Sequence, residues 1–324
     1  MPLKRRLQWL RRSVCGSIHS AVDVMRGRGA SSLRSRLAAT PLMRAEKTYN
    51  TAHPDYKPEL VGNFPGRIHH ASRPCGNQLF LEIRKLAKRD MVPKRVWRKV
   101  HHSVLEEARA VPGFDQVMER KVYIEGYLAE LDRRYGANYF AGWVNLVDAL
   151  FLYWAVRRAK PKTIVQTGVS NGLSSAFMML ALAKNGPEGR LHSIDLPCIF
   201  DPAEAWWTQQ GTIYGVVIPQ GKSSGWMVPE VYRHRFEVEV GDAKALLPPL
   251  IDRLDTIDMF FHDSDHTYNH MTFELDQAVR KLAPNGVIIA DDIAWNASLW
   301  DFADRHNVPG YNYGGTMGVA FLSG

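Results

Sequence analysis

The chain has 324 residues, 45% of them hydrophobic, and a formal net charge of +8 at neutral pH. This length can bury one sizeable core plus an extension, which favours one or two domains. Since no apolar run approaches the ~20 residues that span a bilayer, and Cys15, Cys75 and Cys198 are isolated, the sequence indicates no membrane span, zinc site or disulfide framework.

The excess positive charge lies at the amino terminus. The first 40 residues hold nine Lys or Arg and one acid, Asp23, which leaves 32 basic and 32 acidic residues for the rest of the chain. Apolar residues recur every three or four positions in this segment, which predicts an amphipathic helix over residues 1–26. Such a helix suits an anionic membrane surface or a protein partner; a tail, or a helix packed on the protein itself, is the alternative. Because the remainder is neutral, we expect no nucleic-acid binding.

Three regions follow from the pattern of breakers and helical periodicity. Residues 1–45 form the basic amphipathic arm with its Gly-, Ser- and Arg-rich linker. Residues 46–160 form a helical cap region, with a proline-broken start and helices expected over 78–88, 94–110, 118–134 and 144–160. Residues 161–324 alternate short apolar strands with helices. Strands are expected over 163–167, 190–194, 236–240, 257–262, 287–290 and 317–322, and helices over 173–182, 268–282 and 296–306.

A glycine-containing turn, Gly168-Val169-Ser170-Asn171-Gly172, joins the first of these strands to its helix, and the second strand ends at Asp195. Glycines let the backbone approach a ligand, and an acid at the tip of the second strand can accept hydrogen bonds from ribose hydroxyls. This unit binds mononucleotides, but it does not distinguish a nicotinamide cofactor from S-adenosylmethionine.

Two later motifs narrow the choice. Residues 262–268 (HDSDHTY) follow the fourth strand, and residues 284–292 (PNGVIIADD) contain the fifth. With these motifs, residues 144–324 resemble the class I S-adenosylmethionine-dependent methyltransferases, in particular a small-molecule group with a D-x-D-H motif that is related to metal-dependent O-methyltransferases. The resemblance implies an α/β fold, with a Rossmann-like, mostly parallel seven-stranded sheet, helices on both faces and an α-helical N-terminal cap. It implies S-adenosylmethionine as the cofactor.

By the same resemblance, the cofactor contacts come from the ends of the first four strands. They are Gln166, Gly168, Ser170, Gly172, Asp195, Asp242, Ala243 and Asp263. Asp195 would accept from the ribose, and Asp242 with Ala243 would lie at the adenine. Two positions depart from the family pattern, since Gln166 replaces the usual acid and Ser170 the usual glycine.

The sequence also contains a candidate site for a divalent cation. In the metal-dependent relatives, an Asp after the fourth strand and an Asp-Asn pair after the fifth bind a cation, and Asp263, Asp291 and Asp292 stand at similar places. Oxygen ligands suit Mg²⁺ or Mn²⁺, which would lower the pKa of an acceptor hydroxyl. Asp292 departs from the usual Asn. The alternative, in which the same carboxylates act without metal as bases or hydrogen-bond acceptors, stays open.

The predicted general base is His266, with Asp263 or Asp265 stabilising its imidazolium and Asp263 counted as a second catalytic residue. Alternatively, His266 caps the helix that starts near Thr267. His262 is expected to pack within the sheet.

A long insert, residues 197–235, contains Trp206, Trp207, Tyr214, Trp226 and Tyr232. A loop at the carboxyl edge of a parallel sheet commonly covers a binding crevice. The aromatics either line an acceptor pocket or anchor the loop on the cap.

These observations predict methylation of a small-molecule acceptor at oxygen, in a cytoplasmic protein that the arm would bring to a membrane surface. Methylation at nitrogen, a hydroxylating enzyme on the same fold and a non-catalytic binding protein are the alternatives. A homo-oligomer is left open.

Overall fold

The computed structural model describes residues 75–88, 91–135, 138–197, 208–209, 212–313 and 316–322. All of them belong to one compact unit, Pro58–Gly324. The predicted basic arm, the start of the predicted cap and most of the first part of the insert (residues 198–207 and 210–211) lie outside the described residues. Within the described part of the chain, no helix combines the length and apolarity needed to cross a membrane.

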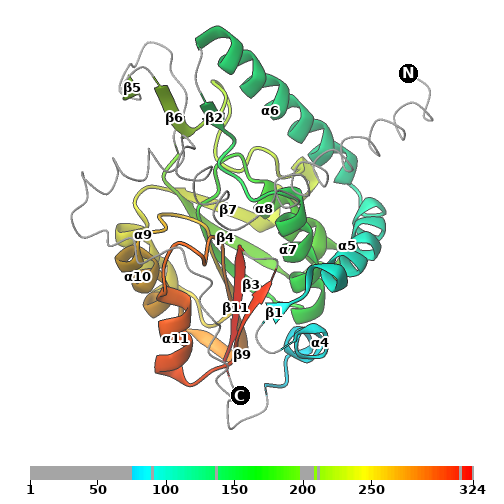
Figure 1. Cartoon of the computed structure of the whole chain (residues 1–324), viewed down its shortest axis with the longest axis vertical. Coiled ribbons are helices and arrows are strands. Elements are labelled where there is room, and N and C mark those ends of the chain that lie inside the picture. The colour runs from blue at the N-terminus through cyan, green and yellow to red at the C-terminus, as the bar shows by residue number, and fades with distance from the viewer. Residues whose placement is uncertain are drawn as a thin grey trace, which may run out of the picture. The chain divides into compact units, whose positions relative to one another are not determined.

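An eight-stranded sheet forms the centre of this unit, in the order β1-β10-β11-β9-β8-β3-β4-β7 (Figure 1). Its strands are β1 (Met91–Val92), β3 (Thr163–Thr167), β4 (Arg190–Asp195), β7 (Phe236–Val240), β8 (Ile257–His262), β9 (Leu282–Ala290), β10 (Gly310–Tyr313) and β11 (Met317–Phe321). All neighbours are parallel except that β11 runs antiparallel to both β9 and β10. The Rossmann-like, mostly parallel sheet is confirmed, and the two-residue edge strand β1 makes eight strands where seven were expected.

Helices cover both faces of the sheet. They are α4 (Gln78–Leu86), α5 (Lys94–Arg109), α6 (Phe114–Tyr135), α7 (Leu146–Ala159), α8 (Leu173–Asn185), α9 (Ala243–Arg253), α10 (Tyr268–Ala278) and α11 (Ser298–His306). The helices α9, α10 and α11 pack side by side on one face, and α7 and α8 pack together on the other, with α4 and α5 against α7 (Figure 1). Most residues of α7 and α8 are buried, as expected for helices that are apolar on nearly all sides.

One helix was not predicted. The segment of α9 contains Pro248 and Pro249, which ordinarily interrupt a helix. Its start is nevertheless stabilised by Asp242, whose side chain accepts a hydrogen bond from the backbone N–H of Lys244.

The insert contains secondary structure that was not predicted either. Its strands β5 (Thr208–Gln209) and β6 (Thr212–Val216) are antiparallel, and β6 pairs in parallel with β2 (Asn138–Phe140), which follows α6. This small second sheet lies beside the far end of α6 (Figure 1). A 3₁₀ helix, Glu230–Arg235, then leads back to β7.

Candidate active site

The turn after β3 crosses the carboxyl end of the sheet in left-handed backbone conformations. Gly168 has a φ of +78°, and a Cβ at this position would lie 1.9 Å from the carbonyl oxygen of Asp263. Gly172 has a φ of +90°, and its Cβ would lie 2.6 Å from the Cα of Gly225. Both glycines are therefore required by the packing of the chain itself, whatever ligand the turn also approaches.

Ser170 is also left-handed, with a φ of +49°, a conformation that glycine adopts more readily than serine. Its hydroxyl donates to the carbonyl of Ala141 over 2.9 Å. Asn171 donates to the same carbonyl and to that of Val217, over 2.8 Å each, and accepts from the indole N–H of Trp226. These bonds tie the turn to the loop before α7 and to the insert.

Asp195, at the tip of β4, holds the turn in place. Its Oδ1 accepts from the backbone N–H groups of Val169 and Ser170, over 2.9 and 3.2 Å, and its Oδ2 accepts from the hydroxyl of Ser224. The side chain is buried but still lines the cavity described next. Asp195 therefore organises the turn in addition to the ribose contact predicted for it.

A cavity of about 520 Å³ opens where β3, β4, β7, β8 and β9 end. The predicted residues that line it are Gly168, Ser170, Asp195, Asp242, Ala243, Asp263, His266, Asp291 and Asp292. Ligands of open α/β sheets bind at this edge, outside the carboxyl ends of the strands. No Lys or Arg of the described residues lines the cavity, so its titratable lining consists of aspartates and two histidines, His266 and His270.

Three of these aspartates, Asp263, Asp291 and Asp292, form a largely buried cluster. Burial, followed by the charges of Asp291 and Asp292, raises the pKa of Asp263 well above its usual value. The pKa of Asp291 is raised in the same way, and burial raises that of Asp292 to about 6. Asp292 has a φ of +51°, a conformation that Asp and Asn tolerate better than most residues, and its N–H donates to Asp291 Oδ1 over 2.8 Å.

The cluster does not have the arrangement of a metal site. Among the residues that the structure describes, no three His, Cys, Asp or Glu side chains converge as a metal ion would require. The predicted set Asp263, Asp291 and Asp292 thus meets at one edge without forming a coordination shell, and metal dependence stays a prediction.

His266 lies between two of the carboxylates. Its Nε2 is 3.8 Å from Asp263 Oδ1 and 3.7 Å from Asp292 Oδ2. Burial, with the nearby charge of His262, lowers the pKa of His266 to about 3, so the ring is neutral at pH 7. Asn296 donates to the carbonyl of His266 over 2.8 Å and fixes the loop. The cap of α10 is Thr267, whose hydroxyl accepts from His270 N, so His266 does not have the alternative capping role.

Residues 165–293 match the family model of a methyltransferase domain. This part of the chain is similar to a methyltransferase domain. The match starts within β3 and ends just beyond Asp292, so it spans the turn, Asp195 and the carboxylate cluster. No curated protein matches the chain.

Solved methyltransferase structures are similar to the chain at low identity. The O-methyltransferase TomG from Streptomyces achromogenes is 19% identical, over 56% of this chain and 82% of that one, with a TM-score of 0.41. An O-methyltransferase from Bacillus cereus is 15% identical, over 64% and 91%, with a TM-score of 0.44. The Podospora anserina methyltransferase PaMTH1 is 12% identical, over 71% and 97%, with a TM-score of 0.45.

Gln166 has a different position in the methyltransferase domain from the one predicted. Its side chain is fully buried and does not line the cavity. Its amide nitrogen donates to Gly168 O and Ser174 Oγ, over 2.7 and 2.9 Å, and its oxygen accepts from Ser175 Oγ over 2.7 Å. Gln166 therefore stabilises the turn and the start of α8. An amide suits this position because it can donate and accept hydrogen bonds at the same time.

Sequence reasoning missed two residues: Asp148, which interacts electrostatically with the carboxylate cluster, and Trp143, which lines the cavity. Asp148, in the first turn of α7, is buried and bonded to Thr316 Oγ1 over 3.1 Å and to the amide of Asn145. Burial raises its pKa to about 7 against those hydrogen bonds, and the charge of Asp292 adds to the rise. Trp143, from the loop before α7, lines the cavity. Asp148 and Trp143 precede the first strand, so no motif of the domain could have indicated them.

The described aromatics of the insert anchor it. Trp226 is buried under the guanidinium of Arg120 and the ammonium of Lys222, 5.8 and 5.1 Å from its ring centre. Tyr232 donates to Pro112 O over 2.7 Å. The side chains of Trp206, Trp207 and Tyr214 lie outside the described residues. For Trp226 and Tyr232, the anchoring interpretation holds.

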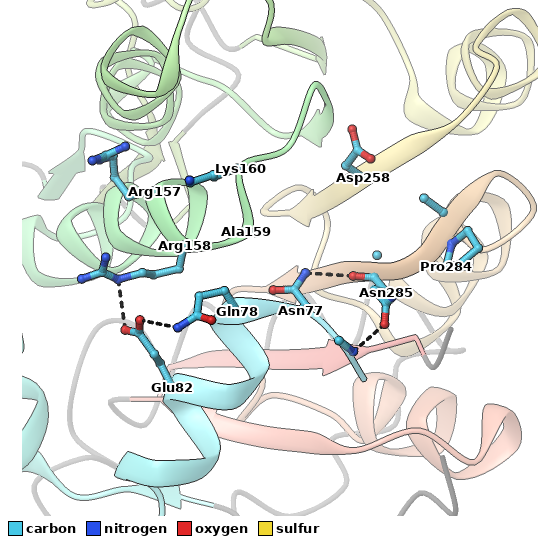
Figure 2. A pocket seen from close by; sticks show the side chains of 13 residues that line it. Asn77, Gln78, Glu82, Arg157, Arg158, Ala159, Lys160, Asp258, Pro284 and Asn285 are labelled. Carbon is cyan, nitrogen blue, oxygen red and sulfur yellow. Dashed lines mark hydrogen bonds and ion pairs between the residues drawn. The ribbon is translucent and has the colours of Figure 1, made fainter. Parts of the chain in front are cut away.

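A second pocket, of about 620 Å³, lies at the opposite edge of the sheet, where β3, β8 and β9 begin. Figure 2 shows that its polar side chains bind one another: Glu82 accepts from Gln78 and pairs with Arg158, each over 3.0 Å, and Asn77 donates to Asn285 O over 2.8 Å. The ion pair joins α4 to α7, and the bond from Asn77 joins the start of α4 to β9.

Proposed function

We propose that this protein transfers a methyl group from S-adenosylmethionine to a hydroxyl oxygen of a small molecule. The observation that carries the proposal is the cavity of the methyltransferase domain, which the glycine turn, Asp195 and His266 all line. Gly168 and Ser170 would border the amino-acid part of the cofactor, Asp195 its ribose, and Asp242 with Ala243 its adenine. The cofactor supplies a methyl group on a positively charged sulfonium, which suits a cavity whose charged side chains are aspartates.

His266 would receive the proton of the acceptor hydroxyl. A methyl transfer from a sulfonium needs the nucleophile aligned with the methyl group, and a hydroxyl needs a route for its proton. His266 is neutral at pH 7 and therefore free to accept. A ring with a pKa near 3 is a weak base by itself. Asp292, which has a pKa of about 6 and is therefore mostly ionised at pH 7, would have to stabilise the imidazolium from 3.7 Å away.

Binding of the cofactor is the first test. We expect the protein to bind S-adenosylmethionine or S-adenosylhomocysteine in calorimetry, and Asp195→Ala to weaken binding by roughly 1–3 kcal/mol through loss of a charged acceptor. Asp252→Ala, which removes an exposed carboxylate paired with Arg280, is the matched control and should bind as wild type does. Tighter binding of a nicotinamide cofactor would overturn the proposal.

Turnover is the second test. Incubation with labelled S-adenosylmethionine and a metabolite extract should label an ether product in a chelator-independent way, because no step here requires a metal. His266→Ala should lower that turnover by about 10²–10⁴ with cofactor affinity unchanged. Loss of labelling with chelator and its return with Mg²⁺ or Mn²⁺ would restore the metal interpretation of Asp263, Asp291 and Asp292. Labelled amines would favour methylation at nitrogen instead.

The basic segment, residues 1–26, would act separately from this chemistry. We propose that it contacts an anionic membrane surface, because it combines an apolar stripe with clustered arginines. Full-length protein should then co-sediment with anionic vesicles, less so in high salt, whereas a truncation that starts at Arg44 should not. Equal partition of both forms would rule this role out.

A further inference from the structure

A buried carboxylate joins three elements directly beneath the candidate active site. Glu274, on α10, is fully buried and is bonded to four side chains. Its oxygens lie 2.6 Å from His262 Nδ1, 2.7 Å from Ser264 Oγ, 2.8 Å from His270 Nε2 and 2.5 Å from Thr167 Oγ1. Burial alone would raise the pKa of Glu274, but its close contacts with His262 and His270 outweigh burial and lower the pKa. Glu274 is therefore ionised.

The ionised carboxylate fixes the proton positions around it. A carboxylate can only accept, so the ring nitrogen that faces it must carry hydrogen. His262 consequently holds its proton on Nδ1 and is left with Nε2 pointing elsewhere. That Nε2 is buried and has no hydrogen-bond partner among the described residues.

A second buried nitrogen without a partner lies on the neighbouring ring. His266 Nδ1 is unpaired in the same way. The two rings are perpendicular, at 89°, with their centres 5.3 Å apart. Leaving a buried polar atom unpaired is unfavourable, and at this ring separation a small rotation of either side chain would let one nitrogen donate to the other. Each of the two unpaired nitrogens can therefore be the hydrogen-bond partner of the other.

We propose that Glu274, His262 and His266 form a relay, in which Glu274 fixes His262 as the Nδ1–H tautomer and His262 Nε2 accepts the Nδ1 proton of His266. The lone pair of His266 is then on Nε2, the nitrogen beside the cavity carboxylates Asp263 and Asp292. Glu274 and His262 are positioning residues, because they reach the cavity only through His266. His262 was expected only to pack in the sheet.

The catalytic meaning of this relay rests on the proposed function. The acceptor's O–H proton would move to His266 Nε2 while its oxygen bonds to the methyl carbon, and the electrons of the breaking C–S bond would stay on sulfur. The Nδ1 proton would remain on His266, held by His262. The proton arrangement itself requires no activity and can be measured directly.

The experiment is ¹⁵N NMR of histidine-labelled protein at pH 7, with signals assigned by substituting single histidines. We expect both His262 and His266 as Nδ1–H tautomers. An Nε2–H tautomer or an imidazolium at either ring would overturn the relay, whether or not the protein binds S-adenosylmethionine. Conversely, failure to bind the cofactor would overturn the proposed function and leave the relay standing.

A variant pair sharpens the result. His262→Phe keeps an aromatic ring but removes both nitrogens, so His266 should lose its single Nδ1–H state. Thr167→Val removes a hydrogen bond from the same carboxylate without touching either ring, and both tautomers should persist. An unchanged His266 signal in His262→Phe would contradict the proposal. If that variant does not fold, the wild-type spectrum still decides.

Discussion

A pocket of similar size lies at each end of the strands of the central sheet, but the polar side chains of the two pockets have different partners. At the edge where the strands begin, Asp258 accepts from the backbone N–H groups of Lys162 and Thr163, and Glu82 is shared by Gln78 and Arg158. At the edge where the strands end, Asp263, Asp291 and Asp292 lie together, and no Lys or Arg of the described residues lines their cavity. Charges that the chain has paired stabilise the fold, whereas charges brought together and left unpaired are available to a ligand.

The largest effect is expected at the glycine turn of the carboxyl edge. Gly168→Ala would place a Cβ 1.9 Å from Asp263 O at a φ of +78°, so the turn must move and cofactor binding should be lost in calorimetry. The matched control is Gly126→Ala in α6, where nothing lies within 4 Å of the new Cβ. It should retain binding and raise the free energy of unfolding by about 0.5–1 kcal/mol. Unaltered binding in Gly168→Ala would show that the turn does not contact the cofactor.

A smaller, pH-dependent effect is expected for Asp148. Its pKa, raised to about 7, means that the folded protein holds this proton more tightly than the unfolded chain does. The corresponding stability is present below the unfolded pKa, near 4, and is lost as the pH rises through about 7. Asp148→Asn imitates the protonated acid, so its midpoint of thermal unfolding should rise relative to wild type between pH 5 and pH 8. A difference that is independent of pH would contradict the raised pKa.

The smallest effect is expected at the opposite edge. Asn285→Ala removes the acceptor of the Gly76 N–H, 2.6 Å away, and leaves alanine at a φ of +63°. We expect a loss of about 1–3 kcal/mol in the free energy of unfolding and unchanged affinity for S-adenosylmethionine. Weakened cofactor binding would show that the two ends of the sheet are energetically coupled.

The motifs predicted the site better than they predicted its chemistry. Gly168, Asp195, Asp263 and His266 do line one cavity, because the carboxyl ends of parallel strands share an edge. A histidine pKa near 6.5, the ordinary value, was the natural expectation for His266, and burial lowers it to about 3. Burial of a single side chain depends on every element packed over it, so sequence spacing could not have shown this.

The order of elements and the identity of the cofactor-binding turn are determined locally. Apolar runs of four to six residues, glycines where the backbone turns left-handed, and Thr267 or Asp242 ahead of a helix all act on neighbours in the chain. The partners of each charge are decided only by tertiary structure. Asp148 reaches the carboxylates from a helix more than 100 residues earlier, and Glu274 meets Thr167 and His262 because α10 packs against β8, next to β3. Coulombic and hydrogen-bond energies depend on distance in space, which the chain fixes only when the sheet has formed.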